Sequence, residues 1–101
     1  MDEIFEVLSD GNRRKIIALL ALSGEMTVTQ MQKHLDISQP TVSAHLSLLK
    51  KSGLVDCRTY GKWRVYCLNI SHWKLFMSHL ETFFGNGLIT EIKARKSIVS
   101  G

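Results

Sequence analysis

The sequence contains little that could place it in a membrane or cross-link it. No apolar run approaches the roughly 20 residues that a membrane-spanning helix needs, and the acidic N-terminal segment lacks the basic start of a signal peptide. Cys57 and Cys67 do not make the disulfide-dense pattern of a small secreted scaffold, and there is no C-x-x-C pair. We therefore expect a cytoplasmic protein with reduced thiols and no membrane partner.

The sequence also lacks common signatures of catalysis. It contains no G-x-S-x-G, no H-E-x-x-H and no glycine-rich phosphate loop. A chain of 101 residues is the size of one domain, and so small a core leaves little room for a closed active site. These observations predict a single domain over residues 1–101 that is not an enzyme.

Acidic residues are scarce in the middle of the chain. Residues 11–74 carry ten basic side chains against Glu25, Asp36 and Asp56, a local excess of seven positive charges. Four of the six remaining acids lie within the first ten residues. This distribution favours a polyanionic partner, although a solvated basic surface would give the same composition.

Apolar residues at helical spacing predict four helices before Gly53. The cluster at 9–12 can end the first helix and cap the second, Thr27 can cap the third, and Gly53 can end the fourth. The third and fourth helices, joined by a turn around Ile37, outline a helix-turn-helix over residues 27–52. The apolar faces expected for the four helices are Ile4, Phe5 and Leu8; Ile16, Ile17 and Leu20; Val28, Met31 and Leu35; and Val42, Leu46 and Leu49.

The pattern after Gly53 changes from helix to strand. Residues 54–69 are rich in Val, Tyr, Trp, Cys and Thr on both sides of a turn at 60–62, which predicts a β-hairpin. Helical spacing returns in residues 71–87, and residues 88–101 are expected to form a short helix or a flexible tail. The predicted fold is mainly α, with about five or six helices and one two-stranded hairpin.

Three stretches of the chain resemble the winged helix-turn-helix repressors of the ArsR/SmtB family: LSDGNRRKIIALL (8–20), SQPTVSAHLSLLKKSGLV (38–55) and YGKWRVYCLN (60–69). The resemblance implies a homodimer paired through its first and last helices, residues 1–10 and 71–87, with the 54–69 hairpin as the wing. It also implies binding to an inverted-repeat operator in double-stranded DNA and repression of transcription. The aromatic stripe of the last helix is then mainly dimer core, with a ligand pocket or partner groove as the alternative.

The resemblance makes the fourth helix the recognition helix. Such a helix presents side chains from its N-terminal half to base edges. Gln39 can pair with adenine, Thr41 can touch a thymine methyl group, and His45 can donate to a base or a phosphate, unless it is a solvated surface residue. Val42 is expected both at the DNA-facing surface and on the inward apolar face of this helix. The residues expected to meet DNA around this helix are Ser38, Gln39, Thr41, Val42, Ser43 and His45.

Pro40, the only proline, lies near the expected start of the recognition helix. The first turn of a helix has amide groups without intrahelical partners, so proline removes little there and presets φ. Either Ser38 or Gln39 can act as the cap, and the restriction that proline places on the preceding residue favours Gln39. Pro40 is therefore predicted to be the first helical residue.

Basic residues gather at two further places. Arg58, Lys62 and Arg64 flank the hairpin turn, where they suit contact with phosphates or the minor groove, although a charged edge also discourages strand aggregation. The second helix opens with Arg13, Arg14 and Lys15. Two or three of them, Arg14 among these, are expected to reach phosphate, although one could equally pair with an N-terminal acid. Several phosphate contacts would make binding strongly dependent on salt.

The sequence lacks the metal ligands that many members of this family carry. Where a family metal site resembles ELCVCDL, this chain reads EMTVTQM, so Thr27 and Thr29 replace both thiolates. His72 and His79 are about 10.5 Å apart along a helix axis, so one ion cannot bind both from the same chain. Only an antiparallel partner helix could bring His72 of one chain close to His79 of the other. We expect no metal and no other cofactor, with a metal response through these histidines as an alternative.

The two cysteines allow a redox hypothesis. A two-residue turn at Gly61-Lys62 would pair Cys57 with Tyr66 and point Cys67 to the other face, which disfavours a disulfide, whereas a longer turn would favour it. The leading hypothesis is a dimeric repressor without a cofactor. The alternatives are a ligand-, redox- or metal-responsive repressor and a protein-interaction adaptor that no longer reads DNA.

Overall fold

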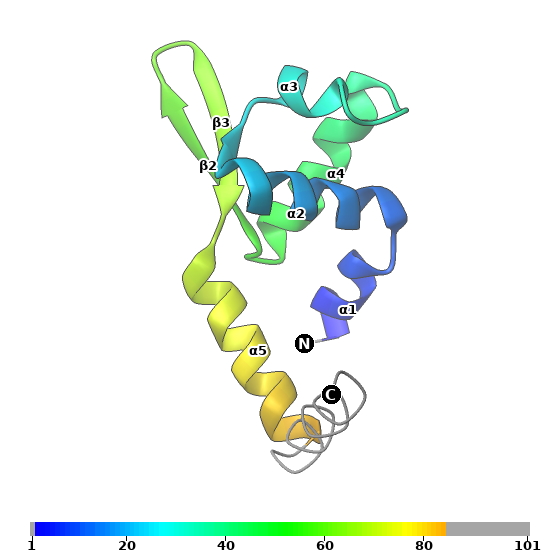
Figure 1. The fold of residues 1–101 in the computed structure, drawn as a ribbon, viewed down its shortest axis with the longest axis vertical. Helices are drawn as coiled ribbons and strands as arrows, with labels where there is room; N and C mark the ends of the chain where they lie inside the picture. Colours follow the sequence, from blue (N-terminus) through cyan, green and yellow to red (C-terminus); the bar gives the residue numbers. More distant parts are fainter. Residues whose placement is uncertain (1, 85–101) are drawn as a thin grey trace, which may run out of the picture.

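The computed structural model describes residues 2–84 and has the predicted mainly helical architecture with a small antiparallel sheet (Figure 1). The predicted short helix or tail at 88–101, and the end of the helix predicted over 71–87, lie outside these residues. The elements are α1 (Asp2–Leu8), α2 (Gly11–Ser23), β1 (Glu25–Met26), α3 (Val28–Gln32), α4 (Gln39–Lys51), β2 (Val55–Tyr60), β3 (Trp63–Leu68) and α5 (Ile70–Phe84).

Side-chain caps fix the starts of α2 and α3. Asp10 caps α2, because its Oδ1 accepts hydrogen bonds from the backbone N–H groups of Asn12 and Arg13 at 2.8 and 3.1 Å. Thr27 caps α3 through a capping box in which its hydroxyl and the Gln30 side chain each accept from the other's backbone N–H. The predicted role of Thr27 is confirmed.

The recognition helix α4 begins one residue earlier than predicted. Ser38, not Gln39, is the N-cap, and its Oγ lies 3.4 Å from the backbone nitrogen of Thr41. The short serine side chain can accept from this N–H group three residues later. Gln39 is not the cap, because it is the first residue of the helix itself. Pro40 is therefore the second helical residue, and its missing N–H group is still one of those that need no intrahelical partner.

The turn between α3 and α4 is longer than predicted. Helix α3 ends at Gln32, although the predicted apolar face of this helix continues to Leu35, so residues 33–38 connect it to α4. Leu35 is nevertheless buried beside Met31, as its apolar spacing predicted. The apolar spacing therefore predicted the burial of Leu35 correctly, although Leu35 lies in the connection after α3 and not in the helix.

The wing belongs to a three-stranded sheet in the order β1-β3-β2. Strands β2 and β3 form the predicted hairpin, with Tyr60 opposite Trp63 across a two-residue turn at 61–62. The short strand β1 pairs with the other edge of β3, placing Met26 opposite Tyr66. The predicted two-stranded wing is confirmed, whereas β1 was not predicted, because a strand of two residues is too short to show an alternating pattern.

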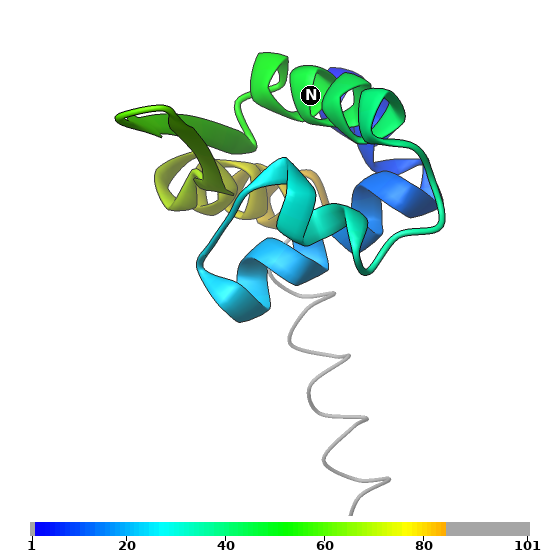
Figure 2. The ribbon, with the colours of Figure 1, turned by 90° about the horizontal axis from the view of Figure 1, so that it is seen from above.

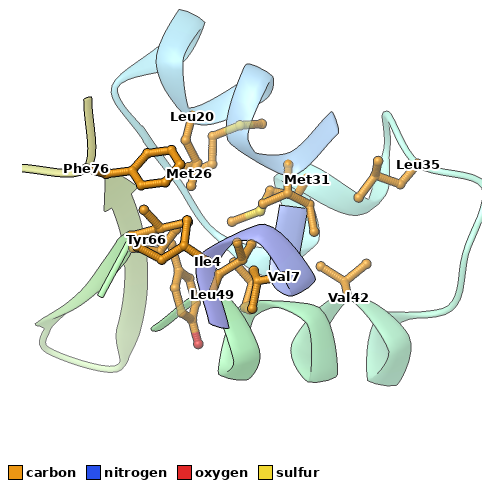
Figure 3. Packing of buried hydrophobic residues seen from close by; sticks show 14 residues of the cluster. Ile4, Val7, Leu20, Met26, Met31, Leu35, Val42, Leu49, Tyr66 and Phe76 are labelled. Atoms are coloured by element: carbon orange, nitrogen blue, oxygen red, sulfur yellow. The ribbon is translucent and has the colours of Figure 1, made fainter. Parts of the chain in front are cut away.

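The core lies between α2, α3, α4 and the base of the sheet, as Figure 3 shows for part of it. Helix α1 covers this core with Ile4 and Val7. The largest completely buried side chains come from α2, α3, α4 and the base of the sheet. These residues are Ile16, Leu20, Met31, Val42, Leu46, Leu49, Leu54 and Val55.

Helix α5 leaves this body from the base of the wing, while the tip of the wing projects on another side (Figures 1 and 2). The carbonyl oxygen of Leu54 fixes this junction, because it accepts from the backbone N–H of Asn69 and from the indole N–H of Trp73, each at 3.0 Å. Asn69 caps α5 by accepting from the backbone N–H of His72 at 3.0 Å. Among residues 2–84, no helix has the length and apolar character to cross a membrane.

Candidate nucleic-acid interface

The N-terminal half of α4 presents a polar surface. Ser38, Gln39, Thr41 and Ser43 are all exposed, and α4 contains no acidic residue. The hydroxyl groups of Ser38 and Thr41 lie 2.8 Å apart and are hydrogen-bonded to each other. This pair holds the first turn in place while Gln39 and Ser43 remain available to a partner.

Val42 does not belong to this surface. Its side chain is completely buried in the cluster that also contains Leu46 and Leu49. These three residues follow each other at positions i, i+4 and i+7, which places them on one face of a helix. The expectation that Val42 meets DNA was therefore wrong, and its role is to hold α4 against the core.

His45 is also much less accessible than expected. Only 13% of its side chain is exposed, and its Nε2 lies 3.9 Å from Oδ1 of Asp10. Its Nδ1 lies 3.4 Å from Nη1 of Arg13. The imidazole therefore sits between α4 and the start of α2, and the interpretation of His45 as a solvated surface residue is wrong.

Arg13 and Arg14 hold the C-terminal end of α1. Arg14 donates from Nη1 to the carbonyl oxygen of Leu8 at 2.8 Å, and Arg13 donates from Nε to the carbonyl oxygen of Val7. The last carbonyl groups of a helix lack intrahelical partners, so these contacts satisfy them. Within the part of the chain that the structure describes, neither arginine pairs with an N-terminal carboxylate, the alternative considered for this group, and contact of the exposed Arg14 with phosphate stays a prediction.

The wing carries its positive charges on both faces of the hairpin. Arg58 is opposite Val65 and Arg64 is opposite Thr59, so the two arginines point to opposite sides. Lys62 lies in the turn, and its Nζ is 5.3 Å from the centroid of the Trp63 ring. Arg58, Lys62 and Arg64 are all exposed.

Arg58 has a carboxylate partner at the base of the wing. Its Nη1 lies 3.6 Å from Oε1 of Glu25 in β1. A hydrogen bond with the Tyr60 side chain, followed by the charges of neighbouring groups that include Glu25, raises the pKa of Arg58 above its ordinary value. Within residues 2–84 the structure places no carboxylate within ion-pair distance of Lys62 or Arg64.

The hairpin register separates the two cysteines. Cys57 is opposite Tyr66, as predicted for a two-residue turn, and Cys67 is opposite Asp56. Both thiols are free, and Cys67 is buried. The two side chains point to different faces of the sheet, so the structure does not favour a disulfide between them.

His72 packs against the end of the recognition helix. Gly53 has φ +87°, and a Cβ atom at this position would lie 2.8 Å from Nε2 of His72. Glycine is required here both by the backbone conformation and by the close imidazole ring. His79 is exposed about two turns further along α5. Residues 2–84 contain no group of three or more potential metal ligands.

These elements define a winged helix-turn-helix domain: a helix-turn-helix with an exposed, polar recognition helix, next to a basic β-hairpin. The family described as "Bacterial regulatory protein, arsR family" matches residues 10–56. The chain is 44% identical over 64 residues to the "Uncharacterized HTH-type transcriptional regulator MJ1325" of Methanocaldococcus jannaschii, covering 63% of this chain and 72% of that protein. The chain belongs to the arsR family of transcriptional regulators.

Two further proteins place the chain in the same family. It is 38% identical over 69 residues to the "Transcriptional repressor SdpR" of Bacillus subtilis, covering 68% of this chain and 76% of that protein. A solved structure described as "Possible transcriptional regulator for arsenical resistance" superposes with a TM-score of 0.72 at 30% identity, covering 90% of this chain and 96% of the other. The predicted fold and family are confirmed.

Proposed function

We propose that this protein is a sequence-specific DNA-binding repressor that acts in the cytoplasm as a homodimer on an inverted-repeat operator and needs no metal. The observation that supports this function best is the rigid first turn of α4. Ser38 and Thr41 fix this turn through their mutual hydrogen bond, and Gln39 and Ser43 are exposed beside them. Short polar side chains on a capped helix start are what a major-groove reader needs.

The charge distribution supports a nucleic acid as the partner. Helix α4 has no acidic residue, and Lys62 and Arg64 extend the positive surface along the wing. Contacts from the wing to phosphates would fix the register of the recognition helix on the duplex, while Gln39 and its neighbours read bases. Arg58 would contribute less, because Glu25 already offsets its charge.

The exposed apolar side chains of α5 support a homodimer. Leu75 and Met77 are 61% and 52% exposed, although α5 is more apolar than either α2 or α4. Phe5 of α1 is half exposed and lies edge-to-face against Phe76 of α5, with ring centroids 5.7 Å apart. A second copy that packs against α1 and α5 would remove this apolar surface from water.

The residues present support repression without a bound metal. The Thr27 hydroxyl caps α3 by accepting from the backbone N–H of Gln30. In the family metal site that resembles ELCVCDL, a cysteine thiolate stands at this position. His72 is held against Gly53. Neither residue is arranged as a ligand.

The test is a fluorescence-anisotropy titration with duplexes from the promoter of the protein's own gene. The wild type should bind one duplex about a thousandfold more tightly than a shuffled duplex, with an affinity that falls steeply with salt. The double variant Gln39→Ala, Thr41→Ala should lose this preference, whereas Lys74→Ala on α5 should keep it. Equal binding of all duplexes by the wild type, or no binding, would contradict a repressor and favour a protein-interaction adaptor.

A further inference from the structure

We infer that His45 is a positioning residue: as the neutral tautomer with its proton on Nε2, it links the recognition helix α4 to the junction between α1 and α2. Through this link, the helix that we place in the dimer interface is connected to the helix that we place on DNA. The inference rests on the proposed function and adds a residue and a route of coupling to it.

The chemistry of the two neighbours of His45 determines its tautomer. A guanidinium group can only donate hydrogen bonds, so the His45 Nδ1, 3.4 Å from Nη1 of Arg13, has to be the acceptor. The ring proton then lies on Nε2, which faces Oδ1 of Asp10 at 3.9 Å. A doubly protonated ring would direct an N–H group at the Arg13 cation, so the neutral form fits both neighbours.

Both neighbours are themselves held by backbone groups. Asp10 accepts from the N–H groups of Asn12 and Arg13 as the cap of α2. The hydrogen bond from the Arg13 backbone is the main cause that lowers the pKa of the Asp10 carboxyl, so Asp10 stays a carboxylate beside the imidazole. The guanidinium of Arg13 is fixed by the carbonyl oxygens of Val7 and Glu6.

These contacts make a continuous chain from α5 to the DNA-facing surface. Phe76 of α5 contacts Phe5 of α1, and the end of α1 binds Arg13. Arg13 binds His45, which lies one helical turn after Thr41 on α4. A shift of α1 relative to α2 would therefore displace His45 and, with it, the first turn of the recognition helix.

A base-reading role does not fit the same observations. Both ring nitrogens of His45 face protein groups, and little of the side chain reaches solvent. A residue that reads a base would affect binding at one operator position, whereas a positioning residue affects all positions alike. This difference is measurable.

The test uses three variants at position 45 and a set of operators with single base-pair changes. His45→Ala should bind every operator about tenfold more weakly, as expected for the loss of one hydrogen bond to a charged group, with an unchanged order of preference. His45→Asn keeps an acceptor near the position of Nδ1 and should recover most of the affinity. His45→Gln keeps only an N–H group toward Asp10 and should recover less. A loss of preference at a single base pair in His45→Ala would contradict the inference and make His45 a base reader.

Two matched arginine variants test the link itself. Arg13→Gln and Arg14→Gln each remove a donor to the end of α1, but only Arg13 contacts His45. The combined loss for His45→Ala with Arg13→Gln should be smaller than the product of the single losses, and with Arg14→Gln it should equal the product. Equal behaviour of the two arginines would contradict the link.

The readouts separate this inference from the proposed function. If no operator is bound by the wild type, the proposed function fails, and the same cycles measured as shifts in urea midpoint still test the contact between His45 and Arg13. Nitrogen NMR shifts of the His45 ring in the wild type give the tautomer directly. The Nε2-protonated form is expected at pH 7.5, and the Nδ1-protonated form would contradict the inference. Circular dichroism confirms that each variant is folded.

Discussion

Helices α4 and α5 are both amphipathic, but they differ in how far their apolar side chains are buried. Val42, Leu46 and Leu49 of α4 are completely buried within the chain. Leu75 and Met77 of α5 are more than half exposed. Of the α5 residues whose side chains the structure describes, only Phe76 belongs to the buried core. The apolar face of α4 is covered by the domain itself, with Leu48 as its large exposed apolar residue, whereas α5 still presents an apolar face to solvent.

This difference separates two properties of the proposed repressor. The orientation of α4 is fixed by the core of a single chain, so its DNA-facing surface is formed before any partner is bound. In the proposed dimer, the position of α5 relative to the second copy would set the distance between two such surfaces. Substitutions in the two helices should therefore have different consequences, and the following predictions test this.

The largest effect is expected from Leu46→Ala in α4. Removing a fully buried leucine side chain should lower the free energy of unfolding by about 3 kcal/mol, because it leaves a cavity. Urea denaturation followed by circular dichroism measures this loss. Leu22→Ala, at a position of α2 where the side chain is 88% exposed, is the control, and a loss of the same size there would show that burial of Leu46 is not the cause.

The double variant Leu75→Glu, Met77→Glu should separate the proposed dimer without unfolding the domain. Four carboxylates in a paired apolar interface would be costly to bury, so sedimentation should give a monomer. Affinity for an operator with two half-sites should fall about a hundredfold, because the second half-site is no longer bound as part of one complex. Affinity for a single half-site should not change, and an intact dimer would contradict our placement of α5.

Ser38→Ala should have a moderate effect on α4. The variant loses the N-cap hydrogen bond and the partner of the Thr41 hydroxyl, and its free energy of unfolding should fall by about 1 kcal/mol. Differential scanning calorimetry measures the change. Ser47→Ala, at an exposed position of the same helix, should leave the stability unchanged and serves as the control.

The smallest effect is expected from charge removal at the wing. Lys62→Gln and Arg64→Gln should each weaken DNA binding only a few-fold at low salt and reduce the slope of log affinity against log salt by about 1. Their stability should match the wild type. Lys74→Gln is the matched control, because it removes one positive charge from α5, outside the two strands of the wing. An unchanged slope in both wing variants would exclude phosphate contacts there.

Local patterns in the sequence predicted much of this structure. Thr27 was predicted as a cap because it directly precedes the apolar face of the third helix. The two-residue turn, one of two turn lengths that the sequence left open, fixes every pair of the hairpin from Tyr60–Trp63 to Val55–Leu68. Both depend only on neighbours in the chain, and both were confirmed.

The sequence failed where distant residues determine the outcome. His45 and Arg13 are 32 residues apart, so nothing near His45 indicated that its ring would be enclosed. Strand β1 exists only because β3 offers it an edge. At the start of α4, a general preference of residues before proline outweighed the capping chemistry of Ser38 in our prediction, and the structure reverses that order.

The single oxygen of Leu54 that accepts from both Asn69 and Trp73 acts as a pivot between wing and α5. In the proposed dimer, the angle at this pivot determines the rotational phase of the two recognition helices around the duplex axis. Half-sites one turn apart are separated by about 34 Å, so a small change of angle would put one of the two helices out of phase with its groove. Relatives with other residues at position 73 should therefore differ in the operator spacing they accept, even where the bases they read are the same.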